Sequence, residues 1–138
     1  MRFLITVQLP NDAPQQDWEP SADMVAEMMR YNEELTKAGA LLALDGLRPP
    51  SEGARIEYSG SERTVTDGPY AEAKEVIGGY WIIQAKSKDE AIEWAKRAPF
   101  QEGAVEVRRI QEIEDFPEDV QAVAHLSEEP PQQTKSNL

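Results

Sequence analysis

Residues 78–99 read GGYWIIQAKSKDEAIEWAKRAP, and this stretch contains a strand pattern followed directly by a helix pattern. Residues 79–85 place apolar side chains on both faces of an extended chain, as a central strand does. One face carries Tyr80, Ile82 and Gln84, and the other carries Trp81, Ile83 and Ala85. Ser87 with Glu90 three residues later is a capping-box pattern, which predicts a helix that ends before Pro99.

The N-terminal part of the chain predicts a second strand and helix pair. Residues 2–9 alternate as a strand with unequal faces does. Ser21 can cap a helix that ends near Gly39, and residues 41–44 form a short apolar strand after it. The helix is expected to bury a stripe at three- and four-residue spacing, formed by Met24, Met28, Tyr31, Leu35 and Ala38.

The remaining strands complete an α+β fold. Residues 55–59 and 63–66 predict a hairpin, and residues 105–110 predict a final strand. In chain order the elements give a ferredoxin-like βαββαβ arrangement with an inserted β-hairpin, in which an antiparallel sheet has two helices on one face. The other face would carry Tyr80 and Ile82 without a cover, so we expect a homodimer that packs face to face.

The composition limits the classes of function. A chain of 138 residues fits one domain, and its net charge of -12 repels phosphate backbones, which disfavours direct nucleic-acid binding. The absence of cysteine excludes disulfides, thiolate nucleophiles and Cys-ligated metals. Residues 1–8 read as a strand instead of a secretory leader, and no apolar run approaches the roughly 20 residues of a spanning helix. A cytoplasmic protein without membrane contact is expected.

Residues 113–138 differ in composition from the rest of the chain. They are expected to form a C-terminal extension of a domain that spans residues 1–112. Residues 117–126 predict a short amphipathic piece, and a Pro-, Gln- and Ser-rich tail follows it. The single histidine, His125, lies there and is expected to have a surface or tail-packing role.

Residues 67–70 read Asp67-Gly68-Pro69-Tyr70 and lie in the densest run of turn-forming and charged residues. In combination with further short motifs the chain resembles the YCII-related superfamily, in the branch named for an Asp-Gly-Pro-Phe motif. The further motifs are Ala38-Gly39-Ala40-Leu41, Leu47-Arg48-Pro49, Glu72-Ala73-Lys74-Glu75, Gly78-Gly79-Tyr80, Glu90-Ala91 through Trp94-Ala95, and Glu106-Val107-Arg108. The chain departs from the family pattern with Tyr70 in place of Phe, Ala73 in place of Thr, and Arg109 in place of Pro.

The resemblance implies a dimeric α/β barrel built from ferredoxin-like protomers, with a cleft between the two sheets. It also implies genes that often lie near sigma factors of the extracytoplasmic-function type, and it implies no settled reaction. The better-studied branch of the superfamily suggests a His-Asp catalytic pair. Residues 1–112 contain no histidine, so that mechanism is not carried over to this chain.

Three carboxylates near the motif are the candidate catalytic residues: Asp67, Glu72 and Glu75. A carboxylate that loses solvent in a cleft has a raised pKa and can move a proton near neutral pH. Each also has a structural interpretation, since Asp67 can form a turn with the residues that follow it and residues 72–75 can be a solvated charge run. A magnesium or calcium site is a weaker interpretation because regular ligand spacing is absent, and no metal or cofactor is predicted.

The candidate substrate-binding residues are Lys74, Tyr80 and Arg108. Lys74 or Arg108 can hold an anionic group, whereas Tyr80 on a central strand can also be a core or interface residue. The first functional hypothesis is therefore a small-molecule enzyme or ligand-binding protein with its site in the dimer cleft. The alternative is an accessory or regulatory protein whose acidic surface binds a basic protein. A third interpretation is that the motif only builds a loop and a dimer contact.

Overall fold

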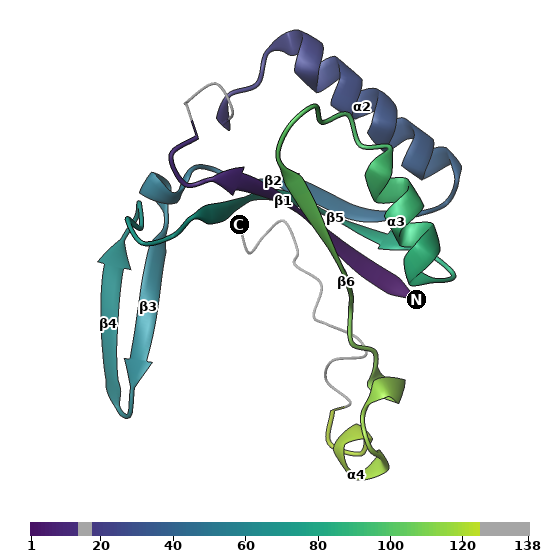
Figure 1. The fold of residues 1–138 in the computed structure, drawn as a ribbon. Coiled ribbons are helices and arrows are strands. Elements are labelled where there is room, and N and C mark those ends of the chain that lie inside the picture. The colour runs from purple at the N-terminus through teal and green to yellow at the C-terminus, as the bar shows by residue number, and fades with distance from the viewer. Residues whose placement is uncertain (14–17, 125–138) are drawn as a thin grey trace, which may run out of the picture.

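The computed structural model describes residues 1–13 and 18–124, so His125 and the polar tail lie outside the described residues. Four antiparallel strands form a sheet in the order β2-β5-β1-β6, which is the ferredoxin-like order. These strands are β1 (Arg2–Pro10), β2 (Leu41–Gly46), β5 (Glu75–Gln84) and β6 (Ala104–Arg109). The helices α2 (Ala22–Lys37) and α3 (Lys88–Lys96) cover one face of this sheet (Figure 1). The predicted α+β class is confirmed.

Both predicted helix starts are confirmed. The Ser21 hydroxyl accepts a hydrogen bond from the Met24 amide at 3.3 Å, and the Ser87 hydroxyl accepts one from the Glu90 amide at 3.1 Å. The Glu90 carboxylate accepts from the Lys86 amide at 2.9 Å, one residue before the position that a capping box predicts. Among the described residues, no helix is long and apolar enough to cross a bilayer.

The buried stripe expected on α2 is only half correct. Tyr31 and Leu35 are buried, whereas Met24 is 54% exposed and Ala38 is also exposed. Periodicity identifies the inward side of a helix, but only the second half of α2 packs on the sheet, so its first turns stay in solvent.

The core lies between the helices and one face of the sheet. Its largest fully buried side chains are Phe3, Ile5, Leu35 and Ile83. Two polar contacts order it: the Trp81 indole donates to the Asn32 side-chain oxygen at 2.8 Å, and the Tyr31 hydroxyl donates to the Trp94 carbonyl at 2.7 Å. The Tyr31 and Trp81 rings meet edge to face with centroids 5.5 Å apart. The buried polar groups on this helix-covered face therefore have hydrogen-bond partners.

The hairpin is a separate two-stranded sheet, formed by β3 (Ala54–Ser59) and β4 (Glu62–Asp67). It follows a 3-10 turn at Pro50–Glu52 and projects from one end of the larger sheet, on the side away from the helices (Figure 1). Its two-residue turn has Gly60 at a φ of 59°, which the first position of such a turn requires. β5 begins at Glu75, four residues before the predicted start at Gly79, because the charged connector continues into the strand.

Two short elements follow β6: a 3-10 turn at Ile113–Asp115 and α4 (Glu118–Gln121). The Arg2 guanidinium holds this segment to β1 through two hydrogen bonds to the Glu112 carboxylate, at 2.8 and 3.1 Å. Arg109 forms an ion pair with Asp115 at 2.7 Å. The amphipathic piece expected over residues 117–126 is thus a single short helix within its described part.

Candidate functional site

The face of the four-stranded sheet opposite the helices carries both polar and apolar side chains that remain at least partly exposed. We call it the open face, because no helix covers it in the described part of the chain (Figure 1). The strand register assigns to it Leu4, Thr6, Gln8, Ala43, Asp45, Glu75, Ile77, Tyr80, Ile82, Gln84, Glu106 and Arg108. Its composition mixes an apolar strip with charged groups, unlike the core face.

Two β-bulges decide which side chains reach the open face. In β2 the register shifts between Leu41 and Ala43, so Asp45 lies opposite Tyr80 instead of facing the core. In β5 the register shifts beside Gly79, so Ile77 pairs with Gln8 and lies on the open face. Each bulge inserts one unpaired residue and reverses the alternation beyond it. Both carboxylates at these strand ends, Asp45 and Glu75, are thereby turned toward the same side.

Tyr80 and Asp45 form the best-defined polar pair of the open face. The Tyr80 hydroxyl donates to Asp45 Oδ2 at 2.7 Å. This hydrogen bond raises the pKa of Tyr80, with desolvation as the second cause. The pair therefore offers a fixed phenol oxygen and a carboxylate with one oxygen left to accept.

The cross-strand register extends this pair into two rows. Asp45, Tyr80, Thr6 and Glu106 are successive neighbours across β2, β5, β1 and β6. The parallel row consists of Ala43, Ile82, Leu4 and Arg108. Three strand spacings span roughly 15 Å, which is the width of a small ligand with polar groups at its ends. An apolar strip is thus bordered by carboxylates on one side and by Arg108 at its end.

Arg108 is exposed, and its side chain has no hydrogen-bond or ion-pair partner among the described residues. On the neighbouring strand β1, the Gln8 side-chain amide donates to the Thr6 hydroxyl at 2.8 Å, so these two side chains are held in place. An unpaired guanidinium on a sheet strand can bind a carboxylate or phosphate in a two-point contact. It is the strongest anion-binding group of the open face.

The motif at residues 67–70 lies at the base of the hairpin. Asp67 ends β4 opposite Ala54, and its side chain is exposed. The Gly68 amide donates to the Gly53 carbonyl at 3.1 Å, and a methyl group at Gly68 would overlap the Pro50 carbonyl. The Gly68–Pro69 peptide bond is cis. This position accepts only glycine because another backbone occupies the space of a side chain.

Tyr70 is the centre of the contacts that fix the hairpin to the larger sheet. The Arg55 guanidinium lies 4.4 Å from the centre of its ring, and Arg55 also pairs with Glu72. The Asn11 side chain donates to the Tyr70 carbonyl at 2.6 Å, and the Asn11 amide donates to the Lys74 carbonyl at 3.0 Å. The motif and the end of β1 are therefore one connected unit.

The electrostatics of Glu72 do not fit a general acid in the single chain. A backbone hydrogen bond and then the Arg55 side chain lower its pKa. This direction is opposite to the one that a proton-transfer role at neutral pH needs. Glu72 is a structural partner of Arg55 in this structure.

The six candidate residues from the sequence fall into two groups. Tyr80, Arg108 and Glu75 lie on the open face, whereas Asp67 and Glu72 lie at the hairpin base, with Lys74 in the connection between them. Sequence reasoning missed Asp45 and Thr6, which contact or neighbour Tyr80. The consecutive glycines at 78 and 79 inside a strand were the available sign of a bulge there, whereas no glycine marks the bulge in β2.

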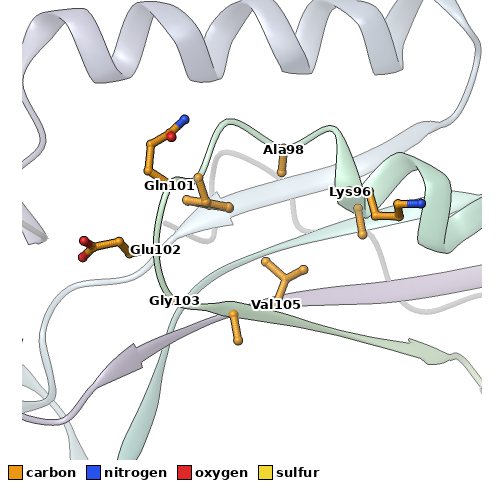
Figure 2. Close-up of a pocket in the computed structure, with 9 residues that line it drawn as sticks. Lys96, Ala98, Gln101, Glu102, Gly103 and Val105 are labelled. Atoms are coloured by element: carbon orange, nitrogen blue, oxygen red, sulfur yellow. The ribbon is translucent and has the colours of Figure 1, made fainter.

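Two surface hollows lie elsewhere, between α3 and β6. The first is lined by the end of α3, the loop after it and the start of β6, including Lys96, Gln101 and Val105 (Figure 2). The second is lined by Lys88, Ile92, Ala95, Lys96, Val105 and Val107. None of the six candidate residues lines either hollow. Over residues 1–13 and 18–124, no group of three or more His, Asp or Glu side chains is arranged to hold a metal ion.

Comparison with known proteins connects the chain to one family. Residues 1–114 match the YCII-related domain. An uncharacterized protein of Rhizobium meliloti (strain 1021) is 34% identical over 81 residues, which cover 57% of this chain and 65% of that protein. The chain thus matches somewhat less than two thirds of the length of this relative.

One solved structure is similar in three dimensions. It is a 5-chloro-2-hydroxyhydroquinone dehydrochlorinase from Burkholderia phenoliruptrix AC1100, in complex with 2,5-dihydroxybenzoquinone. The two chains are 21% identical with a TM-score of 0.44, and the similarity covers 80% of this chain and 94% of that one.

Proposed function

This chain belongs to the YCII-related family, and we propose that it is a small-molecule enzyme or ligand-binding protein whose site is a cleft between two copies. Each copy contributes its open face, so that the homodimer is a dimeric α/β barrel. The proposal keeps the cytoplasmic location expected from the sequence. The site is formed by the domain of residues 1–112, and residues 113–138 are an extension.

The observation that carries the proposal is the Tyr80–Asp45 pair beside the unpaired Arg108 on a sheet face without a cover. A hydroxyl–carboxylate hydrogen bond of 2.7 Å in a partly exposed position stabilises a fold little, yet the bulge in β2 is needed to build it. Closure by a second sheet would remove water from these groups and strengthen their interaction with a ligand. The geometry therefore suits a ligand with an anionic group at Arg108 and a polar group at Tyr80.

The remaining candidates have assigned roles in this proposal. Glu75 is the candidate proton-transfer group nearest the end of the open face, and Asp67 is a second one if the partner covers it. Lys74, which precedes β5 at the other end of the sheet, is the alternative to Arg108 as the group that holds an anion. Glu72 is retained as a candidate from the sequence, although its pairing with Arg55 favours a structural role. No reaction is assigned, because several proton-transfer reactions use these groups.

Ligand binding tests the proposal directly. We would screen small carboxylic acids and phenols by thermal shift and titrate the hits by calorimetry. Arg108→Ala should weaken the binding of acids at least about tenfold, because a charge-assisted contact is lost. Tyr80→Phe should weaken phenols by a smaller factor. Arg30→Ala is the matched control, since Arg30 is an exposed arginine on α2, and it should bind like the wild type.

Two results would contradict the proposal. One is that no compound of the panel binds the wild type, and the other is that hits bind the Arg108→Ala variant equally well. The alternative function, an accessory or regulatory protein in a sigma-factor-linked system, is favoured by the net charge of -12. It predicts binding of a basic protein that salt weakens and that Arg108→Ala leaves intact.

A further inference from the structure

The β3–β4 hairpin has two chemically different faces. Residues that pair directly across an antiparallel ribbon share a face, and here Ile56 pairs with Val65 and Tyr58 pairs with Arg63. This face, which we call the clasp face, consists of Ala54, Ile56, Tyr58, Arg63, Val65 and Asp67. The reverse face consists of Arg55, Glu57, Ser59, Glu62, Thr64 and Thr66. One side of the hairpin is thus mainly apolar and the other is polar.

The clasp face is in solvent in the single chain. Tyr58 is 72% exposed, Val65 is 65% exposed and Ile56 is 45% exposed. Two-stranded ribbons are marginally stable in water unless a further layer covers one face. The hairpin base is nevertheless fixed, through Gly68 against Pro50 and through Arg55 on Tyr70. A fixed arm with an uncovered apolar face is typical of a binding element.

We propose that the clasp face docks on a second copy of this chain, at the border of that copy's open face, and that it carries Asp67 into the shared cleft. The inference rests on the proposed function, because it takes the open faces as the surfaces that meet. It adds a second contact surface and a residue that each site receives from its partner.

Three observations identify a second copy as the occupant. The hairpin projects on the same side of the sheet as the open face, so one twofold axis can cover both surfaces at once (Figure 1). The open face has apolar residues of its own, Leu4 and Ile82, only partly buried. The clasp face carries Arg63 and Asp67, and the open face carries Arg108 beside carboxylates such as Asp45 and Glu106, so opposite charges on the two surfaces can pair across the contact.

The tip of the hairpin has the chemistry of an interface anchor. The Arg63 guanidinium lies 4.6 Å from the centre of the Tyr58 ring, and it donates to the carbonyls of Gly60 and Glu62 at 2.7 and 2.8 Å. Both side chains are therefore ordered before any partner binds, which lowers the entropy cost of docking. Tyrosine and arginine are also the residues in which interface energy concentrates.

Docking would also change the solvent exposure of Asp67. It is the acidic residue of the clasp face and lies at the hairpin base, in solvent. Covered by a second copy, its carboxylate would lose water beside the polar groups of the open face. The site of each copy is then incomplete without its partner's hairpin.

The test compares two neighbouring residues of β4 that lie on opposite faces. Val65→Glu puts a charge on the clasp face, and Thr64→Glu puts the same charge on the reverse face. Analytical ultracentrifugation should show a dimer dissociation constant raised about 30-fold or more by Val65→Glu and within about threefold of wild type for Thr64→Glu. Equal effects of the two variants, or a wild type that is monomeric at millimolar concentration, would overturn the inference.

A second measurement covers the case in which a glutamate disturbs the hairpin. The chain has no cysteine, so Val65→Cys and Thr64→Cys each carry a single thiol. The thiol at 65 should react about tenfold more slowly above the dimer dissociation constant than below it, whereas the thiol at 64 should react at one rate. Concentration-independent protection at 65 would show an intramolecular cover and overturn the inference. If the wild type binds no acid but the variants at 65 and 64 still differ as described, only the proposed function is contradicted.

Discussion

The two faces of the four-stranded sheet use the same strands for different purposes. Ile83 on the helix-covered face is fully buried, and its neighbour Ile82 on the open face is only partly buried. The core face pairs each polar group with a partner, as Trp81 does with Asn32. The open face leaves Arg108 unpaired among the described residues. Strands that look uniformly apolar in sequence thus have one face buried under the helices and one face left partly exposed.

This difference shows that coverage, more than residue type, decides whether a strand residue stabilises the single chain. An isoleucine covered by helices contributes transfer and packing free energy to the single chain. The same residue on an uncovered face contributes only when a second surface arrives. The hairpin repeats the pattern on a smaller scale, with Val65 and Thr64 on opposite faces.

The largest expected effect is on the core face. Ile83→Ala should lower the free energy of unfolding by about 2 to 5 kcal/mol, because it leaves a cavity between α2, α3 and the sheet. Ile82→Ala is its matched control and should cost less than about 1 kcal/mol at concentrations where the protein is monomeric. Urea denaturation of both variants measures the difference. Equal losses would show that the open face is covered within one chain.

The next effect concerns the hairpin base. Gly68→Ala should lower the free energy of unfolding by about 1 to 3 kcal/mol, because its methyl group meets the Pro50 backbone. Hydrogen exchange should locate the loss in β3 and β4. Gly53→Ala is the control, because its added carbon would make only ordinary contacts at 3.6 Å and beyond. If the amide hydrogens of β3 and β4 exchange in Gly68→Ala as they do in the wild type, the contact of Gly68 with Pro50 does not hold the hairpin in place.

A smaller effect follows from the buried Tyr31 hydroxyl. Burial raises the pKa of Tyr31 to about 12, whereas an unfolded tyrosine has a pKa of about 10. The folded state therefore favours the protonated form, and its stabilisation is complete below pH 10 and is lost as the pH rises through 12. Tyr31→Phe should cost about 1 kcal/mol at pH 8 and should reduce the alkaline loss. Tyr58→Phe, on the exposed hairpin, should leave both quantities unchanged.

The smallest effect is expected at the C-terminal extension. Arg2 lowers the pKa of Glu112, and Arg109 lowers that of Asp115, from ordinary values of 4.5 and 3.8. The contribution of these pairs is present above the ordinary values and is lost as the pH falls through the lowered ones. NMR signals of residues 111–124 should therefore shift in acid before those of the core. Simultaneous unfolding of core and extension would contradict this order.

Much of the fold could be predicted from local patterns. Caps at Ser21 and Ser87 and the alternation in β1 are properties of short stretches, so they survive without tertiary information. The stripe on α2 was half wrong, since periodicity does not say how far a helix extends over its sheet. Of the candidate site, Tyr80, Arg108 and Glu75 lie on one face, whereas Asp67 lies apart from them at the hairpin base.

The sequence by itself determined the order of elements and the existence of one unequal sheet, because hydrophobic periodicity and capping act within a few residues. Only the tertiary structure decided that Asp45 faces Tyr80 and that Glu75 shares their side. The reason is that a bulge is defined by the neighbouring strand: one extra residue reverses every side chain beyond it, and the pairing that reveals it joins residues far apart in the chain.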